Sequence, residues 1–384
     1  MKNTMIYPLV IVWLSFVFSN SYAQNTQPLK FTESTVIAKQ ISVFEGTPWG
    51  MSFVDNESLL ITLKQGDLWL LNSITAEKKQ VIGLPEIPVF GQGGLLDVAV
   101  HPAVYKDRDG DPYKWVYFTY IVALEGRATT ALGRAQLSLN TNNSSVIRLV
   151  QWQTLLITKA FSNKGQHFGS RIAFDDAGHV FFGVGDRGTR ETSQDLSNHA
   201  GTIIRLNLDG SVPADNPFVG TAQSLPHIWS YGHRNPQGLA FDSSTHSLFS
   251  SEHGPRGGDE INLIKKGANY GWPIVSFGKE YWGPFAVGEG TEKAGMQAPL
   301  HVYIPSIAPS FLVQYQSNHF FLGALAKTHL NSVRLKKQAG QFVISESRML
   351  KSLAERVRSM AIRADGRAYI GADSGKIYTI EFDK

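Results

Sequence analysis

A short two-strand motif recurs six times along this chain of 384 residues, and it limits the possible folds more than any other feature. Each copy joins a strand of alternating apolar residues to a second short apolar strand through a polar turn, which is the pattern of a β-hairpin. Four clear copies occupy residues 51–62, 172–183, 239–250 and 360–371, and two looser copies occupy 98–120 and 311–323. The chain is therefore expected to fold as a series of hairpins.

The copies are spaced by about sixty residues, which suits one four-stranded sheet and its loops per copy. Several copies continue into a third strand, as at residues 66–71 and 375–380. We therefore predict an all-β, six-bladed β-propeller with four-stranded antiparallel blades and extended loops at 103–112, 186–200 and 276–297. A pair of β-sandwiches is the alternative, but sandwiches do not usually repeat one motif six times.

The N-terminus has the form of an export signal. Lys2 precedes an apolar stretch, Met5–Phe18, and the small residues Ser21 and Ala23 match the pattern that signal peptidase recognises. We predict that residues 1–23 are cleaved, that residues 24–384 form one domain, and that the protein is periplasmic or secreted. A membrane anchor is the alternative, but the stretch is shorter than the ~20 residues that a spanning helix needs. No stable membrane insertion is expected.

Composition excludes several kinds of chemistry. The chain has no cysteine, which removes disulfides, thiolate nucleophiles and cysteine-ligated metal centres. The formal net charge is +4, and its charges are scattered rather than gathered in runs of Lys and Arg, so no nucleic-acid partner is expected. The motifs of zinc proteases, serine hydrolases and phosphate-binding loops are absent, as is the setting of a dinucleotide site.

Four polar segments each stand directly before the first strand of a copy: Gly91–Leu96, Gly165–Arg171, Tyr231–Gly238 and Arg356–Ser359. Loops at equivalent positions in the blades of a propeller meet at one mouth of the central channel. We therefore expect these segments to form one concave polar site.

The residue types in these segments suggest acid–base chemistry on an acidic ligand. His167 is a candidate general base, because imidazole titrates near neutral pH; a structural histidine is the alternative. Arg234, Arg356 and Arg358 form a cationic cluster, and guanidinium groups match carboxylates and oxyanions. Neutral donors and acceptors are supplied by Gln92 and Asn235.

The segment Ser251–Asn262 is a weaker candidate for a metal site. The tight turn at Gly254 and Pro255 would expose backbone carbonyls, which are hard ligands for Ca²⁺, and Glu260 could supply a carboxylate. A solvated acidic turn is the alternative.

Together these motifs are recognisable. The segments Gln92–Leu96, Gly232–Leu239, Glu252–Pro255, Asp259–Asn262, Ala268–Pro273 and Arg356–Arg358, with His167, resemble the soluble quinoprotein glucose dehydrogenase family, above all its branch of periplasmic aldose sugar dehydrogenases. The resemblance runs from about residue 40 to residue 382, essentially the whole mature chain.

The resemblance implies an enzyme that oxidises aldoses at C1 to the lactone with pyrroloquinoline quinone (PQQ) and Ca²⁺, passing electrons to an external acceptor such as a quinone, dye or cytochrome. It implies that His167 is the base and that Arg234 stabilises the developing oxyanion on the cofactor, with Asn235 beside it. The cofactor's carboxylates and quinone oxygens would be held by Gln92, Lys327, Arg356 and Arg358. The carbonyls of Gly254 and Pro255 would bind the Ca²⁺ that polarises PQQ. Glu260 and the carbonyl of Tyr270 would bind a second, structural calcium.

One position departs from the family pattern, which has an aspartate directly before the catalytic histidine where this chain has Gln166. Another acid, such as Asp186, would then have to orient His167. Two other functions stay open: a non-catalytic ligand-binding propeller of the same superfamily, and a calcium-dependent propeller lactonase. The first is expected to lose His167 or the arginine cluster, and the second to gather carboxylates on one metal.

Overall fold

The structure is a computed structural model that describes residues 36–108, 110–138, 146–338 and 341–382. The predicted export signal lies outside these residues. The described residues form strands and two short 3-10 helices, η1 (Arg190–Gln194) and η2 (Lys351–Leu353). In the part of the chain that the structure describes, no helix is long and apolar enough to cross a bilayer. The predicted all-β class is confirmed.

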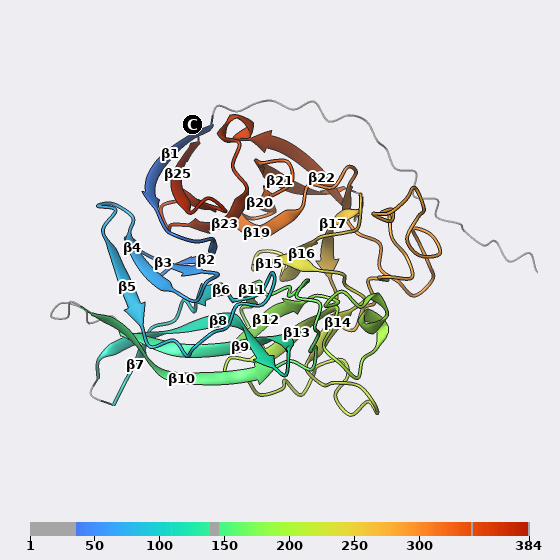
Figure 1. Ribbon diagram of the computed structural model, residues 1–384, viewed down its shortest axis with the longest axis horizontal. Coiled ribbons are helices and arrows are strands. Elements are labelled where there is room, and N and C mark those ends of the chain that lie inside the picture. The colour runs from blue at the N-terminus through green and yellow to red at the C-terminus, as the bar shows by residue number, and fades with distance from the viewer. Residues whose placement is uncertain (1–35, 109, 139–145, 339–340, 383–384) are drawn as a thin grey trace, which may run out of the picture. The chain divides into compact units, whose positions relative to one another are not determined.

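Every repeat copy forms an antiparallel hairpin at the predicted place, and the hairpins extend into larger sheets (Figure 1). The third sheet contains β11 (Ile172–Phe174), β12 (His179–Val184), β13 (Thr202–Asn207) and β14 (Ile228–Tyr231). The fourth contains β15 (Pro236–Asp242), β16 (Ser247–Glu252), β17 (Asp259–Ile264) and β18 (His301–Tyr303). The fifth contains β19 (Pro309–Gln316), β20 (His319–Ala324), β21 (His329–Gln338) and β22 (Gln341–Met349).

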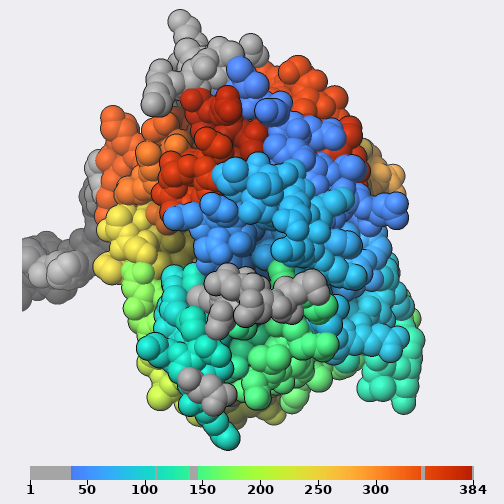
Figure 2. All heavy atoms as spheres, turned by 90° about the vertical axis from the view of Figure 1, so that its left-hand side faces the viewer, coloured from blue at the N-terminus to red at the C-terminus, as the bar shows by residue number. Residues whose placement is uncertain are grey.

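The last sheet joins the two ends of the described chain. It contains β1 (Val36–Val43), β25 (Lys376–Phe382), β24 (Ala368–Ala372) and β23 (Val357–Ile362), in that order. β1 pairs antiparallel with β25, from Val36 opposite Phe382 to Val43 opposite Lys376. The blue and red segments accordingly lie side by side in Figure 2.

The first two copies depart from the expected separate four-stranded sheets, because they share one nine-stranded sheet. Its strands are β2 (Pro48–Phe53), β3 (Ser58–Leu63), β4 (Leu68–Asn72), β5 (Lys78–Ile82), β10 (Ile147–Ile157), β9 (Arg127–Ser138), β8 (Pro112–Leu124) and β6 (Leu95–Val100), with β7 (Tyr105–Lys106) beside β8. The two copies are joined where the edge strands β5 and β10 pair in parallel through two residue pairs, Val81 with Ile147 and Ile82 with Arg148.

The hairpin turns are built by a recurring aspartate. The side chain of Asp55 accepts hydrogen bonds from the backbone N–H groups of Glu57 and Ser58, at 2.8 and 2.7 Å. Asp175, Asp242 and Asp365 accept equivalent bonds in three other copies. Asp is favoured here because its short carboxylate reaches the backbone two residues on and so stabilises the turn.

Alternating side chains of each strand fill the interfaces between neighbouring sheets. β12 sends Val180 and Phe182 into the core shared with the preceding sheet, and Phe181 into the core shared with the following one. This division follows from the two-residue period of a strand, and it explains why second strands are apolar on both faces. The first strands contact one another in a closed ring, in the order β2, β6, β11, β15, β19, β23 and back to β2. This is the arrangement of a β-propeller.

A buried arginine links the first strands at the centre. The Arg171 guanidinium donates to the Asp97 carboxylate at 2.7 Å and to the backbone carbonyls of Gln237, Ser310 and Arg358 at 2.8–3.2 Å. It also lies over the ring of Trp49, 4.3 Å from the ring centroid. One side chain beside β11 thus contacts residues at the other five first strands.

Candidate active site

The strand directions bring the predicted site loops to one end of the ring. The segments with Gln92, His167, Arg234 and Arg356 enter the first strands at this end. Since the second strand of each sheet is antiparallel to the first, the loops after β12, β16, β20 and β24 end there too. Those loops carry Asp186, the pair Gly254–Pro255, Lys327 and Asp373.

His167 is oriented by Asp186, the acid that the sequence left open. His167 Nδ1 lies 2.6 Å from Asp186 Oδ1, and Asp186 also accepts hydrogen bonds from the Gly188 N–H at 2.7 Å and the Trp272 indole N–H at 2.9 Å. Only 1% of the Asp186 side chain is exposed, against 13% for His167. A carboxylate on Nδ1 leaves Nε2 as the unprotonated nitrogen of the neutral ring, which is the tautomer that a base requires.

Burial lowers the pKa of His167 below its ordinary value, although the hydrogen bond and charge of Asp186 act in the opposite direction. Burial alone would raise the pKa of Asp186, but its hydrogen bond to His167, the charges of His167 and Arg234, and the Gly188 N–H together bring it below its usual range. The pair therefore consists of an ionised carboxylate and a neutral imidazole near neutral pH.

The backbone around His167 is held in an uncommon conformation. His167 has φ = 55°, in the left-handed region that non-glycine residues rarely adopt. The amide oxygen of Gln92 accepts a hydrogen bond from the His167 N–H at 2.9 Å. On the other side, the buried guanidinium of Arg187 donates to the carbonyl of Gln166 and lies 3.4 Å from the centroid of the Phe168 ring. Both neighbours of His167 are thus held by one side chain.

Arg234 and Asn235 lie beside this loop and are buried. Arg234 Nη1 donates to the His253 carbonyl at 3.0 Å, and the guanidinium carbon lies 5.3 Å from the centroid of the Trp272 ring. The amide oxygen of Asn235 accepts from the Gly169 N–H at 3.2 Å, so Asn235 shapes the histidine loop. Arg234 supplies positive charge near His167, whose pKa it helps to lower.

Arg356 and Arg358 are brought together by a carboxylate that sequence reasoning missed. Arg356 Nε donates to Asp373 at 2.8 Å, and Arg358 donates to the same carboxylate at 2.7 and 3.0 Å. The Leu325 carbonyl accepts a hydrogen bond from Arg356 at 3.2 Å. Lys327 lies two residues after Leu325 and is exposed. The three groups in contact, two guanidiniums and one carboxylate, leave a net positive charge at this edge of the site.

The four residues predicted to bind calcium line one small cavity of about 20 Å³: Gly254, Pro255, Glu260 and Tyr270. Arg234 and Trp272 also line it, so it adjoins the histidine site. The buried carboxyl group of Glu252 and the partly buried one of Glu260 share the amide of Asn262, at 2.9 and 3.2 Å. Within the described ranges, no three His, Asp or Glu side chains gather as a metal site, so carbonyl oxygens would have to complete one.

Sequence reasoning missed three groups that support the site: Trp272, Arg187 and Asp373. Trp272 was named only as part of a motif, and Arg187 and Asp373 were not singled out. The signal that could have found Asp373 is topological, because the loop that follows each second strand returns to the same end of the ring as the loop before the first strand.

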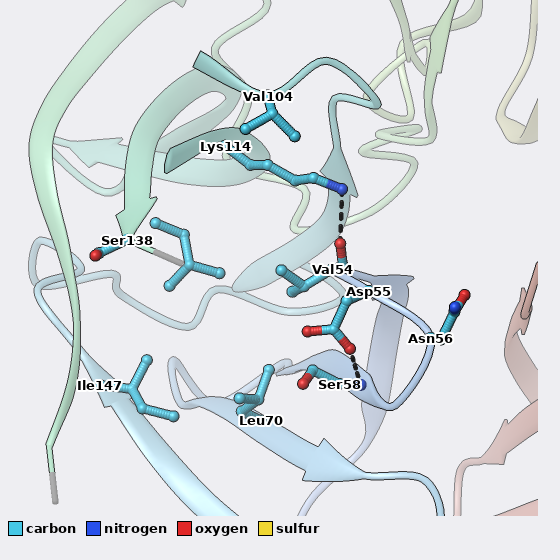
Figure 3. Close-up of a pocket in the computed structure, with 10 residues that line it drawn as sticks. Val54, Asp55, Asn56, Ser58, Leu70, Val104, Lys114, Ser138 and Ile147 are labelled. Carbon is cyan, nitrogen blue, oxygen red and sulfur yellow. Dashed lines mark hydrogen bonds between the residues drawn. The ribbon is translucent and has the colours of Figure 1, made fainter. Parts of the chain in front are cut away.

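A larger cavity, of about 420 Å³, lies between the first two copies (Figure 3). None of the predicted site residues lines it. The charged side chains in its lining form hydrogen bonds with the backbone. Lys114 Nζ donates to the Val54 carbonyl at 2.7 Å, and the Asp55 carboxylate accepts from the Ser58 N–H. No candidate base or cationic cluster lines its walls, so we do not assign the chemistry to this cavity.

Comparison with known proteins shows the family of this chain. The family model described as glucose/sorbosone dehydrogenase matches residues 46–379. The aldose sugar dehydrogenase YliI of Escherichia coli is 35% identical over 87% of this chain and 89% of its own length. Quinoprotein glucose dehydrogenase B of Acinetobacter calcoaceticus is 32% identical over 64% of this chain and 53% of its own. The crystal structure of the soluble aldose sugar dehydrogenase of Escherichia coli in its apo form superimposes with a TM-score of 0.81 at 31% identity, covering 91% of this chain and all of that one. The chain described here therefore belongs to the glucose/sorbosone dehydrogenase family.

Proposed function

We propose that this protein oxidises aldose sugars at C1 to the lactone, with PQQ and Ca²⁺ as cofactors and an external electron acceptor. The observation that carries the proposal is the His167–Asp186 pair at a mouth rimmed by arginines. The proposal is also supported by two relatives that are more than 30% identical to this chain, because both are named as sugar dehydrogenases.

The residues fit an acidic planar cofactor. Arg356 and Arg358 share Asp373 and keep further N–H donors, since a guanidinium carries five. Half of the Arg356 side chain is exposed, so its donors can reach a ligand at the mouth. We assign the binding of PQQ to Gln92, Arg234, Asn235, Lys327, Arg356 and Arg358. When bound, PQQ would accept the hydride from the sugar's C1.

Calcium fits the lining of the small cavity, which offers hard oxygen ligands. The Pro255 carbonyl already accepts a hydrogen bond from Ser306 Oγ at 3.0 Å, which leaves its second lone pair for a cation. We assign Gly254 and Pro255 to the calcium next to the cofactor, and Glu260 and the Tyr270 carbonyl to a structural calcium.

The chain's own residues would then act as follows. His167 Nε2 accepts the proton of the C1 hydroxyl, and Asp186 holds the ring and stabilises the imidazolium that forms. Arg234 would supply positive charge beside His167 that stabilises negative charge developing on the cofactor. The bonds from Gln92 and Arg187 keep the histidine loop in one conformation, so little reorganisation precedes proton transfer.

We further propose that the nine-stranded sheet counts as two blades, which makes six in all, and that residues 24–384 form the catalytic domain of an exported protein. The apolar stretch Met5–Phe18 and the small residues at 21 and 23 support export. Mass spectrometry of the mature protein would show an N-terminus at Gln24.

Reconstitution tests the function directly. Purified protein supplied with PQQ and Ca²⁺ should oxidise aldoses in a dye-linked assay. His167→Ala should abolish the oxidation while leaving PQQ binding by titration intact. His246→Ala is the matched control, because that histidine is 77% exposed. If no aldose is oxidised and PQQ does not bind, the enzyme assignment is wrong and a non-catalytic propeller takes its place.

A further inference from the structure

Three exposed aromatic residues lie within five positions of one another on the loop between β17 and β18. Tyr281, Trp282 and Phe285 are 66%, 75% and 57% exposed. The rings of Trp282 and Phe285 are in contact, with centroids 5.0 Å apart and planes 37° to one another. We call these three residues the aromatic platform. Grouped exposed aromatic residues are costly in water and usually mark a binding surface.

The platform sits on a short hairpin that is fixed at its base. The Glu280 N–H donates to the Phe285 carbonyl at 2.8 Å and closes the hairpin. Arg256 and Lys279 exchange two backbone hydrogen bonds at 3.2 and 3.0 Å, and the Arg256 guanidinium donates to the Gly283 carbonyl. A surface held in this way is preorganised, so little entropy is lost when a ligand binds.

The same hairpin is anchored to the wall of the candidate active site. The carboxylate of Glu280 receives a bidentate bond from Arg190, at 2.5 and 2.7 Å. The Arg190 guanidinium lies 5.5 Å from the centroid of the Trp272 ring, and Trp272 donates to Asp186. Two side chains therefore separate the base of the platform from the carboxylate that orients the proposed base.

We propose that the aromatic platform is a second sugar subsite, which binds the pyranose ring next to the one being oxidised in reducing disaccharides and oligosaccharides. The inference rests on the proposed function. The negative face of an aromatic ring attracts the positively polarised C–H groups on the apolar face of a pyranose. Trp and Tyr provide such a face with few rotatable bonds.

The size of the platform favours a sugar over a protein partner. A stable protein interface takes about 20–30 residues from each side. The platform offers three aromatic side chains on a six-residue hairpin, which matches one or two sugar rings.

The test compares a disaccharide with its monosaccharide. In the PQQ- and Ca²⁺-loaded enzyme, Trp282→Ala should lower the ratio of kcat/KM for cellobiose to kcat/KM for glucose about tenfold, as loss of an apolar substrate contact does. Trp282→Phe should restore most of the ratio. Ile74→Ala, which removes an exposed apolar side chain of the first sheet, is the control and should leave the ratio unchanged.

A second measurement keeps this inference separate from the enzyme assignment. Saturation-transfer NMR on the protein without cofactors should detect cellobiose bound to the wild type and to Ile74→Ala, and much less bound to Trp282→Ala. If the wild type oxidises no aldose but this difference is found, the platform binds a sugar while the proposed function, and with it a subsite beside an oxidised ring, fails. An unchanged kcat/KM ratio overturns the subsite, as does a change confined to the KM of the electron acceptor, which would assign the surface to the acceptor.

Discussion

The buried guanidinium of Arg171 offers the sharpest test of how the ring of sheets is held. Replacing Arg171 with Met removes its bond to Asp97 and its bonds to the carbonyls of three other first strands. Asp97 is 6% exposed. The only hydrogen-bond donor from a neighbouring sheet that it would keep is the N–H of Ile172, at 2.9 Å. Removing one partner of a buried pair costs about 3–5 kcal/mol, because the other charge is left buried without compensation.

This cost converts into a melting temperature. An unfolding entropy of about 2.1 cal/mol/K per residue over roughly 350 residues is about 0.7 kcal/mol/K, so 4 kcal/mol lowers Tm by about 6 °C. Differential scanning calorimetry of Arg171→Met against the wild type measures it. Lys293→Met, which breaks the exposed pair with Glu289, should change Tm by about 1 °C or less. Adding Asp97→Asn should recover part of the loss, because the stranded charge is removed. A shift for Arg171→Met no larger than the Lys293 control, or no recovery in the double variant, would refute the reasoning.

Three further predictions concern protons and the histidine loop. Asp186→Asn removes the carboxylate that raises the pKa of His167. The acid limb of the pH profile of kcat/KM should therefore move to lower pH, and the maximal kcat/KM should fall by about 10²–10⁴. An acid limb that does not move would contradict the pairing of His167 with Asp186. Arg187→Met releases the carbonyl of Gln166 and should lower kcat more than it raises KM. Arg187→Lys should recover part of kcat. If both variants lose the same fraction of kcat, Arg187 acts in folding alone. Burial lowers the pKa of His199 to about 3. Below about pH 6.5, His199 is therefore protonated in the unfolded chain but stays neutral in the folded chain. Stability should therefore fall between pH 7 and pH 5, by about 2 kcal/mol from His199 alone, and chemical denaturation should find a smaller fall in His199→Asn.

The hairpins could be predicted from sequence because their signals are local. The alternation of apolar residues and the aspartate of each turn, such as Asp55 or Asp175, act within a few residues. The junction of the first two copies had no such signal. It consists of two residue pairs between β5 and β10, which lie far apart in the chain.

The candidate site was predictable where motifs precede first strands, and less so elsewhere. His167 and the arginines were found in this way, whereas Asp373 lies in an ordinary-looking turn between β24 and β25 and acquires its position from strand register. Gln92 shows a different limit. Its residue type suggested a cofactor ligand, and the structure adds a bond from its amide oxygen to the backbone of the histidine loop.

The pairing of β1 with β25 has a consequence for synthesis. The ribosome makes β25 after every other described strand, so the sheet that contains β1 and β25 stays incomplete until β25 has been made. Until then the nascent chain is an open ring, and both of its unfinished edges present unpaired backbone groups that can pair with other chains. The ring can thus close only after β25 has been made, and loss of the seven residues of β25 would leave β1 without its partner strand while the other sheets could still form.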